Sequence, residues 1–256
     1  MSIALHNIYV PAGFPGAKRP LFEGLDIEIP GGTRIGVLGA AKSGKSTLLR
    51  LICGTKLPEG GTVKGDMRTS WPIPLSTFFV NATSVARNIR FVARLYGIPG
   101  DDFPRRIATS VGIAEFLNTP IGKCPKFVKQ RLALALGVGL DFDMYLFDGA
   151  LTPVDKPFKE AAAEMVAGRM SGRGYVLVTS VPGEAEKHCD SVYVLDAGKA
   201  RYFTETEKGI EYFKELLAAE KQKPDGEKTA KQAAQDDEET DIGDIDMVAA
   251  AVMDEL

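Results

Sequence analysis

The spacing of hydrophobic residues along the chain predicts an α/β protein, in which short buried strands alternate with amphipathic helices. Helices are predicted where apolar residues recur every three or four positions, and strands where they alternate or run without a break for about five residues. The strands are expected at residues 2–9, 25–29, 34–38, 69–72, 144–147, 175–179, 191–195 and 199–203, and residues 57–63 are expected to form a turn that leads into a further strand. The helices are expected at 45–54, 84–96, 101–117, 126–140, 156–170 and 206–220.

Three of the predicted helices form an insertion between two strands. They lie between the extended segment at 69–72 and the apolar strand at 144–147. Ser84 is expected to cap the first helix and Gly97 to end it. The pattern therefore predicts one α/β domain over residues 1–220 with a helical subdomain at about 82–140.

A glycine-rich stretch follows the predicted strand at 34–38 and leads into the next helix. This order of strand, glycine loop and helix is the context that the phosphate-binding pattern G-x-x-x-x-G-K-[ST] requires. An ordinary glycine turn is the alternative, but nine positions in order make it improbable. The nine residues are Gly39, Ala40, Ala41, Lys42, Ser43, Gly44, Lys45, Ser46 and Thr47.

The residue types of this loop indicate how it holds a nucleotide. Glycines allow successive backbone N–H groups to point at one phosphate, and the helix adds the positive end of its dipole. Lys45 can reach the β- and γ-phosphates, and the Ser46 hydroxyl can bind Mg²⁺. A second acidic ligand is expected after an apolar strand, and Asp148 follows the strand at 144–147. The loop therefore predicts binding of ATP or GTP together with Mg²⁺.

Composition limits the class of protein. The chain has 256 residues, 45% of them hydrophobic and 25% charged, which is ordinary for a globular protein. It lacks an apolar stretch of 18 residues and a signal-peptide pattern at its start. Three scattered cysteines indicate a reducing cytoplasm, and nothing in the sequence indicates a nucleic-acid partner.

The net charge of −3 conceals an uneven distribution. Residues 232–256 contain nine acidic side chains and neither lysine nor arginine. Residues 221–256 are expected to be an acidic tail, which is disordered over 221–241 because that part has almost no large apolar side chain. At its end, apolar residues recur at helical spacing after Asp244, which predicts either a short docking helix for a protein partner or a frayed terminus. These apolar residues are Ile245, Val248, Ala249, Val252, Met253 and Leu256.

Two sequence segments indicate which family of nucleotide-binding proteins the chain resembles. The segments Ser70-Trp71-Pro72 and residues 90–97, Arg-Phe-Val-Ala-Arg-Leu-Tyr-Gly, resemble ATP-binding subunits of capsular polysaccharide exporters, a group of ATP-binding cassette (ABC) proteins. Asp148 lies 103 residues after Lys45, and this separation with its helical insertion is also typical of ABC domains. The resemblance covers about residues 1–220 and implies a P-loop NTPase fold with a mixed central sheet and an inserted helical subdomain.

The resemblance also implies partners and a location. Two such subunits, identical or different, trap ATP between them and drive a polytopic membrane permease. That assembly would export a lipid-linked acidic glycan, with this chain on the inner face of the inner membrane.

Residues that such subunits use for hydrolysis are replaced in this sequence. The glutamine that binds Mg²⁺ and senses the attacking water falls at Val80, with Asn81 beside it. The glycine of the signature loop falls at Phe127, next to Lys126. The acidic residue that polarises water falls at Gly149, and the histidine that contacts the γ-phosphate falls at Ser180.

The sequence therefore predicts ATP binding with weak or absent hydrolysis. The leading interpretation is an exporter subunit with degenerate catalytic residues. A second is an ATP-sensing regulatory or scaffold protein derived from such a subunit and signalling through its acidic tail. A third, a small-molecule kinase, is disfavoured because no arginine-rich lid is evident.

Overall fold

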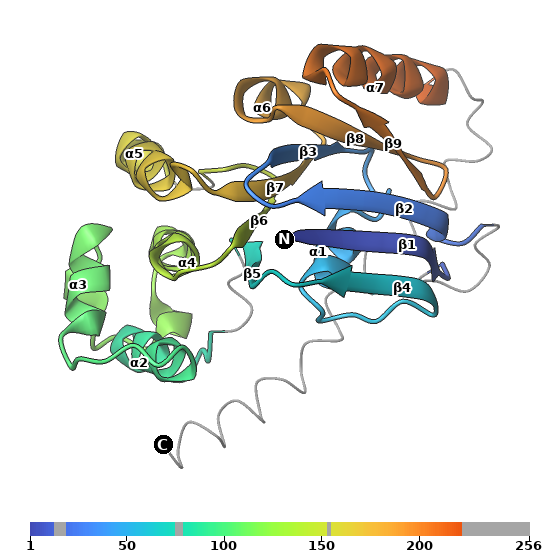
Figure 1. The fold of residues 1–256 in the computed structure, drawn as a ribbon. Coiled ribbons are helices and arrows are strands. Elements are labelled where there is room, and N and C mark those ends of the chain that lie inside the picture. Colours follow the sequence, from blue (N-terminus) through green and yellow to red (C-terminus); the bar gives the residue numbers. More distant parts are fainter. Residues whose placement is uncertain (13–18, 75–78, 153–154, 222–256) are drawn as a thin grey trace. The chain divides into compact units, whose positions relative to one another are not determined.

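The computed structural model describes residues 1–12, 19–74, 79–152 and 155–221, and its elements alternate as the sequence pattern predicts (Figure 1). The strands are β1 (Ser2–Val10), β2 (Phe22–Pro30), β3 (Arg34–Leu38), β4 (Gly60–Gly65), β5 (Thr69–Ile73), β6 (Met144–Asp148), β7 (Gly174–Thr179), β8 (Ser191–Asp196) and β9 (Lys199–Phe203). The α-helices are α1 (Lys45–Ile52), α2 (Val85–Leu95), α3 (Phe103–Ser110), α4 (Lys126–Gly139), α5 (Lys159–Met170), α6 (Pro182–His188) and α7 (Thr206–Lys221). Short 3₁₀ turns are η1 (Ala114–Phe116), η2 (Ile121–Lys123) and η3 (Lys156–Phe158).

The described chain divides into two compact units. The first contains Met1–Ile73, Asp141–Leu151 and the described residues from Val166 onward. The second contains the described residues of Pro74–Leu140 and Thr152–Met165. The three helices inserted between β5 and β6 thus form the greater part of a unit of their own.

The first unit is built on a six-stranded sheet in the order β5-β6-β7-β3-β8-β9. The strands from β5 to β8 pair in parallel, and β9 joins β8 as an antiparallel hairpin. The sheet is therefore mixed, as predicted. Because β3 lies between β7 and β8, the loop that leaves β3 starts near the middle of the carboxyl edge of the sheet. Ligands of open α/β sheets bind at such an edge.

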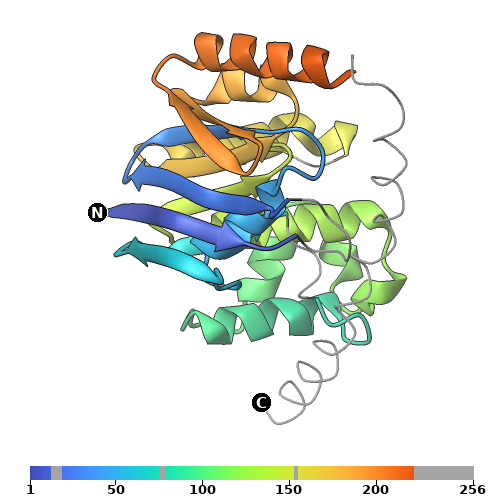
Figure 2. The ribbon, with the colours of Figure 1, turned by 90° about the vertical axis from the view of Figure 1, so that its right-hand side faces the viewer.

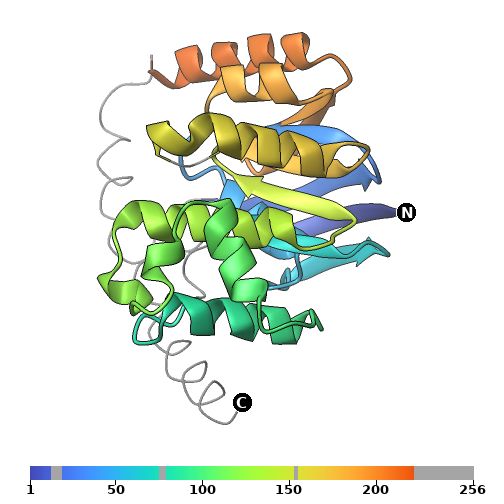
Figure 3. The same ribbon diagram turned by 90° about the vertical axis from the view of Figure 1, so that its left-hand side faces the viewer.

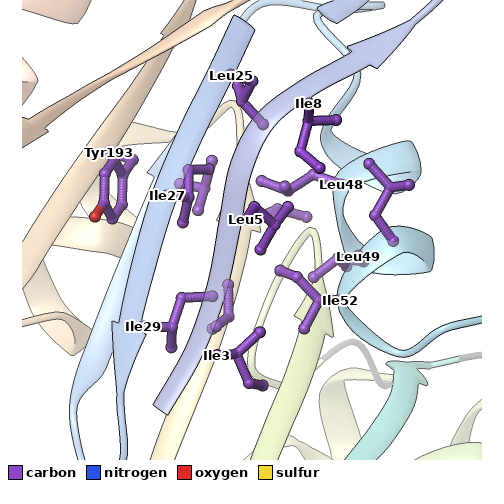
Figure 4. Close-up of a cluster of buried hydrophobic side chains, with 14 of the residues drawn as sticks. Ile3, Leu5, Ile8, Leu25, Ile27, Ile29, Leu48, Leu49, Ile52 and Tyr193 are labelled. Carbon is purple, nitrogen blue, oxygen red and sulfur yellow. The ribbon is translucent and has the colours of Figure 1, made fainter. Parts of the chain in front are cut away.

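A smaller antiparallel sheet, β2-β1-β4, completes the first unit (Figure 2). Its apolar side chains share one buried cluster with α1, as Figure 4 shows. Leu48 and Leu49 of α1 are fully buried beside Leu5 and Ile8 of β1. This packing fixes the helix that follows the phosphate-binding loop.

The described part of the second unit consists of α2, α3 and α4 with their connecting turns (Figure 3), together with η3 and the first part of α5. Ser84 caps α2 as expected, since its side chain accepts a hydrogen bond from the Arg87 N–H at 3.3 Å. In α4, every residue from Leu132 to Val138 is buried, which explains the apolar run in that part of the sequence. The α4 helix is therefore central to its unit.

The prediction of one helix over residues 101–117 is wrong. Helix α3 ends at Ser110, and the chain resumes only as the 3₁₀ turn η1. Gly112 has a φ of +65°, a left-handed conformation that ends the helix. The sequence pattern also did not predict α6. None of the described helices has the length and hydrophobicity needed to cross a membrane. The expectations for the tail from residue 222 lie outside the described residues.

Candidate nucleotide-binding site

The loop of residues 39–47 connects β3 to α1, and its tight course depends on two glycines. Gly44 has a φ of +94°, and a Cβ atom there would lie 2.6 Å from the Phe22 ring. A Cβ atom on Gly39 would lie 2.2 Å from Ser43 Oγ. A larger residue at either position would therefore displace a neighbouring side chain, Phe22 at position 44 and Ser43 at position 39.

Lys45, the first residue of α1, folds back over this loop. Its Nζ donates hydrogen bonds to the carbonyl oxygens of Gly39 at 2.9 Å and Ala40 at 2.6 Å. Burial lowers the pKa of Lys45, and the negative charge of Asp148 opposes that shift. A partly buried ammonium of this kind attracts the oxygens of a polyphosphate.

The start of α1 offers donors that fit phosphate groups. The helix has no side-chain cap and no acidic residue in its first turn, so its first N–H groups point outward without a side-chain acceptor among the described residues. Ser43 Oγ is buried and also lacks a hydrogen-bond partner within the described part of the chain. Lys42 is exposed and takes a left-handed φ of +65°. These groups fit the triphosphate of a nucleotide.

Two oxygen ligands for a divalent cation meet beside the loop. Ser46 Oγ donates a hydrogen bond to Asp148 Oδ2 at 2.9 Å, although the two residues are 102 positions apart in the sequence. Asp148 is the last residue of β6, and Ser46 is exposed in the first turn of α1. Hydroxyl and carboxylate oxygens are ligands that suit Mg²⁺. The structure thus brings together the two residues that the sequence assigns to the metal.

The residues at the next two expected catalytic positions also lie in the first unit. Gly149 follows Asp148 with a φ of +95°, and its N–H donates to the Val178 carbonyl at 2.8 Å. A Cβ atom on Gly149 would meet nothing within 4 Å among the described residues, so the absent side chain is not replaced by a neighbour. Ser180 is exposed directly after Thr179, whose carbonyl accepts a bond from the Gly39 N–H at 3.3 Å.

Val80 lies in the second unit and is held by a buried asparagine. Its side chain is buried, and its N–H donates to Asn88 Oδ1 at 2.9 Å. Asn88 Nδ2 donates in return to the Val80 carbonyl at 3.2 Å. Asn81 is exposed, and its carbonyl accepts a bond from Gly122. The position expected to bind Mg²⁺ thus carries a side chain in the apolar core of its own unit.

Phe127 is half-buried and packs against other residues of the second unit. Its ring meets Phe116 edge-on at 5.9 Å and lies under the Arg131 guanidinium, 5.0 Å from the ring centroid. Arg131 also lies over Phe158 and donates to both carboxylate oxygens of Asp155, at 2.7 and 2.5 Å. These hydrogen bonds hold the pKa of Asp155 below its usual range. Lys126 is exposed at the start of α4.

Sequence reasoning missed Asn88 and Arg131. Asn88 lies on the buried side of α2, between Val85 and Val92. A polar residue on an otherwise apolar helical face was the available signal, since buried amides require partners. The signal for the ion pair of Arg131 was weaker, because its partner Asp155 lies 24 residues away and no local spacing links the two.

Comparisons with known proteins identify the family to which these features correspond. The sequence model of the family described as ABC transporter matches residues 22–152. The ATP-binding protein BexA of Haemophilus influenzae is 31% identical over 197 residues, which are 77% of this chain and 91% of BexA. The capsule polysaccharide export ATP-binding protein CtrD of Neisseria meningitidis is 29% identical over 77% of this chain and 92% of CtrD.

Two further comparisons, one of sequence and one of structure, also match ATP-binding transport proteins. The polysialic acid transport ATP-binding protein KpsT of Escherichia coli is 28% identical over 83% of this chain and 96% of KpsT. A solved ATP-binding subunit of an ABC transporter superposes with a TM-score of 0.69, over 83% of this chain and 93% of that one. At 18% identity this last likeness concerns the fold alone, and it confirms the predicted ABC-type ATPase fold.

Proposed function

The chain belongs to the ABC transporter family, and we propose that it is the ATP-binding subunit of an exporter of capsular or related cell-surface polysaccharide, with ATP hydrolysis weak or lost. The names of the relatives BexA, CtrD and KpsT support the transport class. The contrast between a complete phosphate-binding loop and the missing side chain at Gly149 carries the proposal on hydrolysis.

ATP binding is supported by the geometry of the loop. Lys45, the buried Ser43 hydroxyl and the N–H groups that begin α1 would hold phosphate oxygens. Ser46 and Asp148 would hold Mg²⁺, which neutralises phosphate charge when it is bound. All of these residues belong to the first unit.

Weak hydrolysis is supported by the residues found at the four positions where the family resemblance predicts catalytic side chains. Gly149 has no group that could accept a proton from water, and valine at position 80 cannot bind a hard cation. By the family resemblance, Phe127 stands where a glycine is expected, and Ser180 stands where a histidine is expected. Loss of one positioning group commonly slows a reaction about 10²–10³-fold, and losses within one catalytic unit are not multiplicative.

Membership of the ABC transporter family supports a proposal on the partners. We propose that the chain works as a homodimer or with another ABC subunit, on a polytopic permease at the inner face of the inner membrane. A normal second subunit would not restore full activity. One composite site would use this chain's loop with Gly149, and the other would use this chain's segment at Phe127.

The test is to measure ATP binding and phosphate release together on the purified protein with Mg²⁺. We expect saturable binding with phosphate release at least about 10²-fold below that of an active ABC subunit assayed in parallel. Lys45→Ala should abolish the binding and serves as the control. Turnover at an ordinary transporter rate that falls on Lys45→Ala would contradict the proposal on hydrolysis.

The acidic tail favours one alternative, an ATP-sensing regulatory or scaffold protein. Relatives such as BexA are covered almost completely by the match, whereas about a quarter of this chain is not. Co-purification with a polytopic membrane protein would support the exporter. Capture of a partner that depends on residues 242–256, without any membrane protein, would support the alternative.

A further inference from the structure

We infer that the acidic C-terminal segment, residues 236–256, docks on the exposed face of α2 in its own chain and covers an arginine stripe there. The stripe is formed by Arg87, Arg90 and Arg94, all of them exposed. Their spacing of three and four residues places them on one side of the helix, along about 10 Å of its axis.

The arginine stripe lies in the most basic part of the chain. Residues 74–140 contain nine lysines and arginines against three aspartates and glutamates. This surplus of six equals the whole surplus of basic over acidic residues before position 232. The positive charge of the body is therefore concentrated in the second unit rather than spread over the surface, which favours an anionic partner for that unit.

Exposed apolar side chains adjoin the stripe. Leu95 is 64% exposed at the last position of α2, and Tyr96 is 47% exposed at the next. Among the described residues of the second unit, these are the large hydrophobic side chains left most open to solvent. Phe91, half-buried, lies between the arginines and Leu95 around the helix. The surface thus combines positive charge with an apolar edge.

The C-terminal segment has the complementary pattern. Residues 236–241 include five acidic side chains, and four more follow between 244 and 255. The apolar positions from Ile245 to Leu256 recur at helical spacing, so this part can present one apolar face with acidic flanks. Fourteen residues, 222–235, separate the segment from the end of α7, and a linker of this length can span up to about 50 Å when it is extended.

Charge complementarity between one chain segment and one helix face makes the contact sensitive to salt. Exposed ion pairs are individually weak, but several of them with an apolar contact give measurable docking. The same pairs are screened at high ionic strength, where the Debye length falls to about 3 Å at 1 M salt. A docked tail would occupy a surface that any other acidic partner of the second unit also needs.

Amide hydrogen exchange on the full-length protein, followed by mass spectrometry, tests the contact. At 20 mM salt we expect the amides of residues 244–256 to exchange about tenfold more slowly than in an unstructured chain, and this protection to disappear at 1 M NaCl. The triple variant Arg87→Glu, Arg90→Glu, Arg94→Glu should lose the protection at low salt. The triple variant Lys64→Glu, Lys199→Glu, Lys214→Glu makes the same change of charge on exposed sites of the first unit and should keep it.

Three results would overturn the inference. Unprotected tail amides at low salt would exclude docking altogether. Protection that survives the α2 substitutions would place the tail on another surface, and protection that is lost on dilution would place it on a second copy or another molecule. The salt titration needs no substitution, so the inference stays testable even if a variant fails to fold.

Discussion

Ser46 Oγ donates a hydrogen bond to Asp148 Oδ2 at 2.9 Å, so the first turn of α1 and the end of β6 present two oxygens at one point. We expect Asp148→Asn to remove most of the gain in ATP affinity that Mg²⁺ provides, because a neutral amide is a weaker ligand than a carboxylate. The dissociation constant for Mg-ATP should rise about tenfold or more. Fluorescence titration with an ATP analogue, with and without Mg²⁺, measures the effect.

A matched control lies beside the other end of the same strand. Asp143 precedes β6 and accepts a hydrogen bond from the Arg68 N–H at 2.8 Å, on the first unit's framework. Asp143→Asn should leave the Mg²⁺ dependence of ATP binding unchanged. Equal losses of that dependence in the two variants would mean that Asp148 acts through stability rather than as a metal ligand.

Lys45 gives a second prediction on binding. Its Nζ donates hydrogen bonds to the carbonyl oxygens of Gly39 and Ala40, inside the loop that would surround the phosphates. Lys45→Met keeps most of the apolar stem but removes the charge, and we expect the affinity for ATP to fall at least about tenfold while that for adenosine changes little. Lys56→Met, beyond the end of α1, is the control. Calorimetric titration with both ligands separates the loss of phosphate contacts from a general loss of binding.

The nucleotide-binding half of the site could be predicted because its signals are local or have a fixed order. Residues 39–47 are adjacent in sequence, and an apolar strand ending in an acidic residue marks Asp148. The parallel pairing of β6 with β7 and of β7 with β3 then carries Asp148 to the same sheet edge as the loop. Sequence pattern and sheet topology together are sufficient here.

Other features depend on contacts that the sequence does not reveal. The pairing of Arg131 with Asp155 joins α4 to the segment after β6, and nothing in the spacing specifies it. The five hydrogen bonds of the Asn88 side chain to residues 80–84 depend on how the chain turns before α2. Gly112 is different, because its position in the sequence is a visible signal for a helix end. The helical spacing of the apolar residues around it instead predicts one continuous helix.

Gly149 gives a prediction on hydrolysis. Gly149→Glu places a carboxylate after Asp148, where a Cβ atom has room, but the φ of +95° strains any side-chain-bearing residue by about 1–3 kcal/mol. We expect the variant to fold with a lower melting temperature and to release phosphate less than about tenfold faster than the parent, because Val80, Phe127 and Ser180 remain. A coupled phosphate-release assay measures this.

Gly149→Ala is the matched variant for that experiment, since it brings the backbone strain without the carboxylate. Its melting temperature should fall by a similar amount, and its phosphate release should equal that of the parent. Full transporter-like turnover in Gly149→Glu alone would show that the residues at the other three positions suffice for catalysis.

The ion pair of Arg131 and Asp155 predicts a stability contribution that acid removes. The two side chains are only 13% and 23% exposed, and the guanidinium holds the pKa of Asp155 below its usual value. A carboxyl with a lowered pKa in the folded state contributes stability above its unfolded pKa of about 3.9, and this contribution is lost as the pH falls through the folded pKa.

Arg131→Met leaves the partly buried Asp155 without its guanidinium while keeping apolar contact with the Phe127 and Phe158 rings. We expect the free energy of unfolding in urea to fall by about 2–3 kcal/mol at pH 7, and the difference from the parent to shrink below about pH 4 as Asp155 becomes protonated. Arg106→Met, which breaks an exposed pair with Asp102, should cost at most about 1 kcal/mol. A cost of Arg131→Met that stays constant from pH 7 to pH 3 would mean that Arg131 stabilises the protein through its aromatic contacts and not through the carboxylate.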